Sequence, residues 1–374
     1  MKQFDITKRD SQATEITPVS PEKFDMDAYA AYEQSLLAGT DAFWNAPSGV
    51  AVYRRMRAAE VFSYACRNMQ RSLELQLGCL QESMKFKADI PNFLEPWYGI
   101  GTTASAFGME YVWSEGLAPA VQAKFNTLAD ALSYTPAPIA ETGIGKFTLN
   151  MIEYFMDKTK GRLPVSFSDA QSPLNAATMI VENTSILMDI ILDPDSIRRF
   201  FDVLAGLAID FVSGQKKLIG DSLVSPGHGF ASARNFEGYG QSDDSVVMLS
   251  GEQYRDCALP SFERTGLAFG GPVFHSCGDW SNKIPVIRQI KGLRMVDAAF
   301  SAETDPNPNA AAPFAEGFAH TGIVLNARIV GDIATIEKTV RELWRPGLKL
   351  IVVTYCPTPE EQEQAYDVIH EICC

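Results

Sequence analysis

One short stretch of the sequence places an imidazole and a thiol at the end of an apolar run. Residues 272–277 read PVFHSC and precede Gly278, and they hold one of only four histidines in the chain. Side chains at positions i and i+2 of a strand face the same way, so we expect His275 and Cys277 to share a face. Another apolar run, LKLIVVTYC, ends in Cys356. One imidazole and two thiolates at neighbouring strand ends would form a zinc site with a position open for substrate.

A second interpretation needs no metal. His275 would then be a hydrogen-bonded core histidine, and Cys277 and Cys356 would be small hydrophobic residues. The odd number of cysteines, seven, does not suggest a disulfide framework and leaves both interpretations open. The Cys-Pro ending of the later run favours the metal site.

The elements that must position these residues alternate along the chain. Short apolar runs predict strands, and amphipathic segments between them predict helices, among which Asp193 and Asp332 are expected N-caps. This alternation predicts an α/β fold with a parallel sheet, and the spacing favours a (β/α)₈ TIM barrel. No G-x-G-x-x-G follows a strand, so no dinucleotide-binding fold is expected. The expected strands are residues 163–169, 272–277, 293–300, 322–330 and 348–356, and a strand before an aromatic loop is expected near residue 90.

The N-terminal part is expected to differ from the rest. Residues 1–50 are polar and weakly periodic and predict an arm or helical extension, and residues 51–374 predict a single barrel domain. Residues 50–86 carry no proline and are expected to form one long helix. The formal charge of −14 argues against nucleic acid or an anionic membrane surface as a partner. No secretory signal or membrane-spanning run is recognised, so a cytoplasmic protein is expected.

The motif HSCGD at residues 275–279, with a strand ending in cysteine about 80 residues later, resembles the uroporphyrinogen decarboxylase superfamily. More narrowly, it resembles its zinc-dependent, corrinoid-linked methyltransferases, such as methylcobamide:coenzyme M methyltransferases. The resemblance covers roughly residues 85–372. It implies a (β/α)₈ barrel whose zinc is held by His275, Cys277 and Cys356. It also implies that Glu303, at the end of LRMVDAAFSAE, can act as fourth ligand and in catalysis; otherwise Glu303 is a loop carboxylate that caps a helix.

The resemblance also implies a reaction and its partners. A methyl group would pass between a small molecule (a thiol, methyl ether or methylamine) and the cobalt of a corrinoid. The chain has no D-x-H-x-x-G signature of a corrinoid-binding module, so the corrinoid is expected on a separate protein. One alternative is a porphyrin decarboxylase, but the arginine-rich M-R-Q-A-G-R segment of those enzymes is not recognised, because YRRMRAAE is expected in a helix. Another alternative is a non-catalytic barrel in which zinc only joins strand ends.

The remaining candidates for the pocket are single residues. Asp169 ends an expected strand and is predicted to contact substrate, unless it caps the next segment. His228 lies in a glycine-rich loop, and Asp243 and Asp244 either point to a cavity or cap a helix. Glu95, Trp97 and Tyr98, in FLEPWYG, could form a pocket wall, although aromatic clusters more often serve packing.

Overall fold

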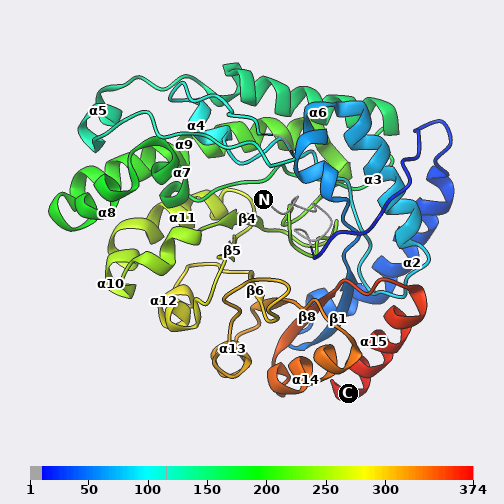
Figure 1. Cartoon of the computed structure of the whole chain (residues 1–374). Helices are drawn as coiled ribbons and strands as arrows, with labels where there is room; N and C mark the ends of the chain where they lie inside the picture. Colours follow the sequence, from blue (N-terminus) through cyan, green and yellow to red (C-terminus); the bar gives the residue numbers. More distant parts are fainter. Residues whose placement is uncertain (1–10, 115, 374) are drawn as a thin grey trace, which may run out of the picture.

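The computed structural model describes residues 11–114 and 116–373 and shows a ring of parallel strands surrounded by helices (Figure 1). Six strands form one continuous sheet in the order β1-β8-β7-β6-β5-β4, and β2 pairs with β3. The strands are β1 Gly49–Arg54, β2 Val165–Ser166, β3 Leu223–Val224, β4 Tyr239–Ser242, β5 Pro272–His275, β6 Met295–Ala299, β7 Val324–Arg328 and β8 Lys349–Thr354.

Isolated pairings close the ring between β1 and β4. The amide of Asp89 donates to the carbonyl of Val52 on β1, and Leu94, a few residues on, pairs with Val165 on β2. Gln171, just after β2, pairs with Ser242 on β4. The predicted α/β barrel is therefore confirmed, with the second strand reduced to a short extended segment and the fourth divided between β3 and β4.

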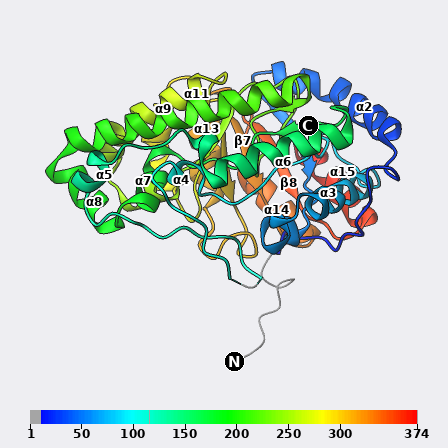
Figure 2. The ribbon, with the colours of Figure 1, turned by 90° about the horizontal axis from the view of Figure 1, so that it is seen from above.

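Helices cover the outside of the barrel. In both Figure 1 and Figure 2, α5, α7 and α8 lie at one end of the molecule and α2 and α15 at the other. The expected N-caps Asp193 and Asp332 accept hydrogen bonds from the amides of Ser196 and Thr335. The helices are α2 Met26–Asn45, α3 Met69–Ser83, α4 Thr102–Ser105, α5 Leu128–Ser133, α6 Gly143–Thr159, α7 Pro173–Ile180, α8 Asn183–Leu192, α9 Pro194–Ile219, α10 Gly251–Gln253, α11 Leu259–Leu267, α12 Ile284–Ile287, α13 Ala311–Phe318, α14 Ile333–Leu343 and α15 Pro359–Ile372.

The prediction of one long helix over residues 50–86 is wrong. Residues 49–54 form β1, which pairs in register with β8, and α3 begins only after Asn68, whose side chain accepts from the amide of Arg71. The segment VAVY is rich in residues that favour a strand, and burial between two layers outweighs the helical periodicity. Residues 1–50 include α2, so much of the expected N-terminal extension is helical; residues 1–10 lie outside the described part of the chain.

Side chains of the strands alternate between the barrel interior and the layer under the helices. On β8, Ile351 and Val353 pack with Val273 and Val324 inside the barrel, whereas Leu350 and Val352 belong to the core beneath the helices. This alternation decides which residues after each strand can reach the cavity at its end. None of the described helices is both long enough and apolar enough to span a membrane.

Candidate active site

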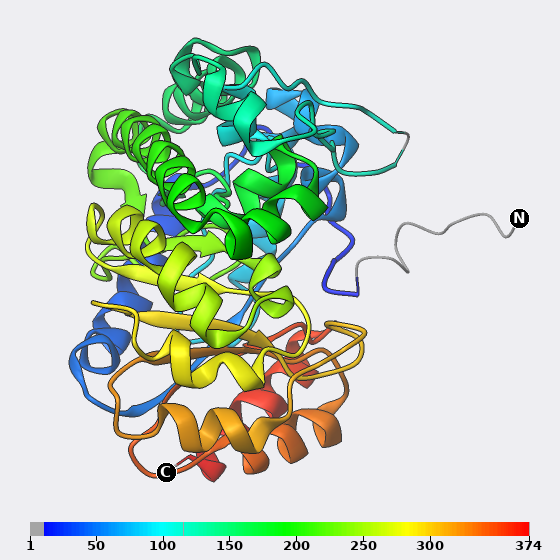
Figure 3. The ribbon, with the colours of Figure 1, turned by 90° about the vertical axis from the view of Figure 1, so that its left-hand side faces the viewer.

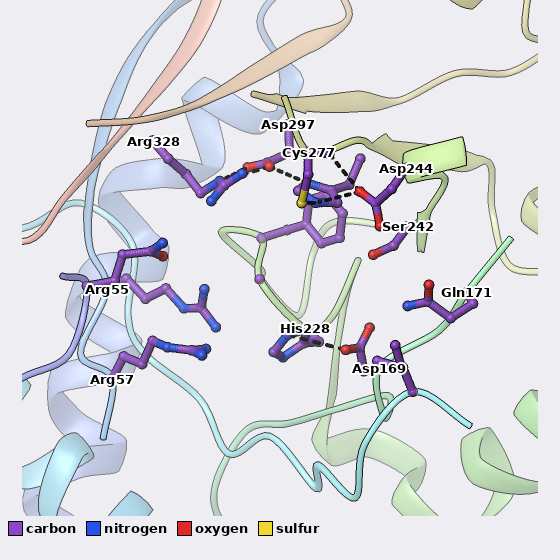
Figure 4. Close-up of a pocket in the computed structure, with 15 residues that line it drawn as sticks. Arg55, Arg57, Asp169, Gln171, His228, Ser242, Asp244, Cys277, Asp297 and Arg328 are labelled. Atoms are coloured by element: carbon purple, nitrogen blue, oxygen red, sulfur yellow. Dashed lines mark hydrogen bonds and ion pairs between the residues drawn. The ribbon is translucent and has the colours of Figure 1, made fainter. Parts of the chain in front are cut away.

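A cavity of about 280 Å³ lies at the carboxyl ends of the strands, where barrel enzymes hold their catalytic residues. Its lining is polar and divides into three groups, which Figure 4 shows facing one another. One group contains a histidine, a thiol and carboxylates that lie on or just after β4, β5 and β6. A second contains His228 and Asp169, and a third consists of arginines that follow β1 and end β7.

Strand register assembles the first group. His275 on β5 is paired with Asp297 on β6, which in turn is paired with Asn326 on β7. All three side chains therefore point into the barrel at one level. The Asp297 carboxylate accepts from His275 Nδ1 at 2.6 Å, from Asn326 Nδ2 at 2.5 Å and from Arg328 Nε at 2.9 Å. Asp297 thereby fixes the orientation of the imidazole and leaves Nε2 directed elsewhere.

The Nε2 atom of His275 faces two further donor atoms. It lies 3.4 Å from the Sγ of Cys277 and 3.7 Å from Oδ1 of Asp244. One possible ligand atom from each of the three residues lies within 4.8 Å of the other two. Asp244 also accepts from the amide of Cys277 at 2.6 Å. Gly278 has a φ of 71°, a left-handed conformation that lets the chain turn away after the thiol. His275 and Cys277 therefore come together as predicted.

Without a bound metal, the surroundings of His275 favour the protonated imidazole, and a metal at Nε2 would replace that proton. Burial acts most strongly and disfavours the charge, but the Asp297 carboxylate and Cys277 together raise the pKa of His275 well above its ordinary value. Burial alone would raise the pKa of Asp297; Arg328 and His275 outweigh it and lower that pKa. The three groups form a buried cation–anion–cation chain, in which each member depends on its neighbour.

The structure does not bring Cys356 to this group, although the sequence predicted it as a ligand beside His275 and Cys277. Cys356 is 2% exposed and lies in the core under the helices with Ala365 and Ile369. It has the parity of Val352, not of Val353, so its thiol points away from the barrel interior. Burial raises the pKa of Cys356 to about 11, which favours the protonated thiol over a thiolate ligand. Tyr355 faces the interior instead.

Glu303 is also placed differently from the prediction. Its side chain is exposed in the loop after β6 and lies outside the group of potential ligands formed by Asp244, His275 and Cys277. Glu303 is also not among the residues that line the cavity. The sequence left two roles open for Asp244, a cavity residue or a helix cap. In the structure Asp244 is the third member of the group with His275 and Cys277.

The second group is built around His228. Its Nδ1 lies 2.5 Å from Oε2 of Glu95, and its Nε2 lies 3.5 Å from Oδ2 of Asp169. Trp97 donates from Nε1 to Asp169 at 3.0 Å. Four of the predicted pocket residues are therefore connected, with His228 and Asp169 lining the cavity and Glu95 and Trp97 buried behind them. Tyr98 lies elsewhere, stacked on Phe147 at 3.9 Å beside a separate cavity.

The third group corrects the conclusion that pocket arginines are missing. Tyr53 faces the barrel interior, and Arg55 and Arg57 continue the same row beyond the end of β1. Arg55 pairs with Glu95 at 3.2 Å, and Arg57 lies over the ring of Phe62 at 3.7 Å. Burial acts first to raise the pKa of Glu95, but Arg55 and His228 outweigh it and lower that pKa to about 2. YRRMRAAE was expected in a helix, and a helix does not place Arg55 and Arg57 on the same face.

A closed barrel with a polar cavity at the strand ends has the architecture of a barrel enzyme. The family model described as uroporphyrinogen decarboxylase (URO-D) matches residues 44–225. A solved structure named methyltransferase from Methanosarcina mazei has the same fold, with a TM-score of 0.59 and 15% identity over 99% of each chain. No curated protein matches the sequence. The predicted resemblance to the uroporphyrinogen decarboxylase superfamily is therefore confirmed.

Proposed function

We propose that the protein is a zinc-dependent methyltransferase that moves a methyl group between a small molecule and the cobalt of a corrinoid on a separate protein. The observation that carries the proposal is the convergence of His275, Cys277 and Asp244 at the wall of the cavity. A structural neighbour named a methyltransferase supports the choice of reaction. The methyl donor or acceptor would be a thiol, a methyl ether or a methylamine. A cytoplasmic location suits the described cysteines, all of which are free thiols.

The donor set fits zinc. Imidazole nitrogen, thiolate sulfur and carboxylate oxygen are the three kinds of zinc ligand in proteins, and three protein ligands are typical of catalytic sites. Sulfur and nitrogen atoms that share one tetrahedral zinc lie about 3.5 Å apart, given bond lengths of about 2.3 and 2.0 Å. The separation of 3.4 Å between Cys277 and His275 agrees with this value. Asp297 is bonded to the other ring nitrogen, where a carboxylate commonly orients a histidine that binds zinc.

In this proposal each protein group has a defined role. His275, Cys277 and Asp244 would hold the metal, and Asp297 with Arg328 would keep the imidazole ring in place. A bound zinc would act as a Lewis acid that stabilises a substrate thiolate or a departing oxygen. Asp169 and His228 stand on another wall of the cavity, where they would orient the substrate and exchange a proton with its heteroatom. Cys277 is exposed to the cavity, which favours catalysis over a purely structural zinc.

A second candidate function is decarboxylation of a porphyrin. Arg55 and Arg57 line the cavity directly after β1, and guanidinium groups bind carboxylates through paired hydrogen bonds. The chain lacks the M-R-Q-A-G-R sequence, yet the structure supplies two arginines in a comparable basic segment. Decarboxylation needs no metal, so it should not depend on Cys277, whereas the proposed methyltransferase reaction should.

The two functions can be separated with free methylcobalamin and uroporphyrinogen as probes. The zinc-loaded protein is expected to demethylate methylcobalamin in the presence of a suitable thiol, which changes the visible spectrum of the corrinoid. Cys277→Ser is expected to abolish this activity, whereas Arg57→Gln should retain the metal. Loss of carboxyl groups from uroporphyrinogen, unaffected by Cys277→Ser, would refute the methyltransferase proposal and support the second candidate.

A further inference from the structure

The first described residues of the chain run across the mouth of the cavity. In Figure 1 the dark-blue segment begins over the centre of the ring of strands and passes towards α3, and Figure 3 shows it beyond the ends of the strands. Gln12 belongs to the lining of the cavity. This segment precedes the part of the chain that the family model matches, which begins at residue 44. The proposed chemistry assigns it no role.

One end of the segment is tightly packed on α3. The amide of Val19 donates to the carbonyl of Glu74 at 2.9 Å, and Ile16 packs against the apolar cluster that contains Leu75 and Cys79. A Cβ atom at Gly78 would lie 2.2 Å from the carbonyl oxygen of Thr17. The close approach of the two backbones therefore requires glycine at position 78.

The other end reaches the opposite side of the mouth. The amide of Thr14 donates to the carbonyl of Arg57 at 2.7 Å, and Arg54 Nη2 donates to Thr14 Oγ1 at 3.2 Å. Ser11 Oγ donates to the carbonyl of Glu303, in the loop after β6. Strands β8 and β7 separate β1 from β6 in the sheet, so residues 11–14 span the mouth between these contacts.

The two ends differ in how firmly they are held. The contacts on α3 involve a buried apolar cluster and close backbone packing, whereas the hydrogen bonds of the crossing named above start from the exposed Ser11 and the half-buried Thr14. The net contribution of such hydrogen bonds to stability is small, so the crossing can open locally while the barrel remains folded.

We infer that residues 11–17 form a strap that covers the cavity and determines the size of the molecules that reach Cys277. Ile16 and Thr17 anchor the strap, and residues 11–14 open and close over the site. Gln12, carried on the moving part, would contact a bound substrate only when the strap is closed. The inference concerns access and holds for either candidate reaction.

The protein contains its own reporter of this access. Cys277 is exposed, whereas Cys66, Cys79, Cys257, Cys356 and Cys373, the other described free cysteines, are buried. Its alkylation by iodoacetamide and by a maleimide carrying a long polyethylene glycol chain can be measured on the same sample, with the modified peptide identified by mass spectrometry. The ratio of the two rates reports steric access, because any protection by metal or change in thiolate reactivity affects both reagents.

Gly78→Ala tests the strap through its anchor, and Gly214→Ala is the matched control, since a Cβ at Gly214 of helix α9 would meet nothing within 4 Å. We expect Gly78→Ala to raise the rate of the bulky reagent relative to iodoacetamide by about tenfold, the factor that corresponds to 1.4 kcal/mol of lost strap contacts. Gly214→Ala should leave the ratio unchanged.

Hydrogen exchange at the Val19 amide shows whether the strap has moved. An unchanged alkylation ratio in Gly78→Ala, with the Val19 amide newly exposed to exchange, would overturn the inference. If the Val19 amide stays protected, Thr14→Pro removes the hydrogen bond to Arg57 directly, and an unchanged ratio in that variant would overturn the inference equally. Protection by metal affects both reagents alike, and no corrinoid or substrate enters the assay. Failure here therefore leaves the proposed function standing, and failure of the proposed function leaves the strap standing.

Discussion

Replacing Asp297 with asparagine tests the buried charge chain at the base of the site. Asp297 is 2% exposed, and both of its carboxylate oxygens face donors: Asn326 Nδ2 and Arg328 Nε approach Oδ1, and His275 Nδ1 and Arg328 Nε approach Oδ2. In Asp297→Asn one oxygen becomes an NH₂ group that must meet another donor, and Arg328 loses its counter-charge. Breaking a buried ion pair by changing one partner costs about 3–5 kcal/mol.

Urea unfolding is the assay for this effect, with zinc affinity measured by competition with a chromophoric chelator. We expect Asp297→Asn to lower the free energy of unfolding by about 3–5 kcal/mol and zinc affinity by about 10–100-fold. The double variant Asp297→Asn/Arg328→Met removes the unpaired cation and should recover much of the stability but not the zinc affinity. A loss below about 1 kcal/mol in the single variant would refute the argument that the charges depend on one another.

Three further predictions concern other parts of the molecule. Glu95→Gln should destabilise the protein at neutral pH, because the pKa of Glu95 is about 2 in the folded protein against an ordinary 4.5. The stabilisation by the charged carboxylate is present above about pH 4.5 and is lost as the pH falls towards 2, so the difference in melting temperature from the wild type should shrink over that window. A constant difference would contradict the pairing. Cys356→Ser should lower the free energy of unfolding by about 1–3 kcal/mol in urea titrations, because it buries a hydroxyl in an apolar core. Unchanged stability would argue against the observed burial. Gly145→Ala should lower the free energy of unfolding by about 1–3 kcal/mol or more, because its Cβ would lie 1.8 Å from the carbonyl oxygen of Ile139. In Gly143→Ala the added Cβ meets nothing within 4 Å, so this variant should be neutral. Equal melting temperatures for the two variants would refute this explanation.

The sequence was sufficient to predict the barrel and the pair at the end of β5. Apolar runs separated by amphipathic segments have few solutions other than a parallel sheet covered by helices. The i, i+2 spacing of His275 and Cys277 placed both on one face, and the structure confirms this. The first strand was missed because VAVYRR also fits helical periodicity, and only its pairing with β8 reveals the strand.

The third member of the candidate metal site could not be predicted without the strand phase. Tyr355 and Cys356 are adjacent and alternate in direction, so an error of one residue in the phase exchanges the interior with the outer layer. The inward positions of β8 are known only once Ile351 and Val353 are seen to pack inside the barrel. Asp244 lies two residues after the end of β4, whose pairing with β5 brings it beside His275 although the two residues are 31 positions apart in sequence.

Some missed residues did carry a signal. Asn326 and Arg328 interrupt the apolar run GIVLNARIV at a spacing of two, and Asp297 interrupts LRMVDAAF. Polar residues within an otherwise buried strand must be satisfied by neighbours, and their spacing of two marks a common face. That pattern predicts an internal polar network, although it does not identify which histidine the network orients.

The zinc content of the purified chain is the direct test of the proposed metal site. We expect about one zinc per chain in the wild type, determined by elemental analysis, because three potential ligands converge at the cavity wall. Cys277→Ser should lose most of the metal, whereas Cys356→Ser, whose thiol lies outside the group, should retain it. Absence of zinc from the wild type after anaerobic purification with zinc supplied would refute the zinc site, and so would loss of zinc from Cys356→Ser alone.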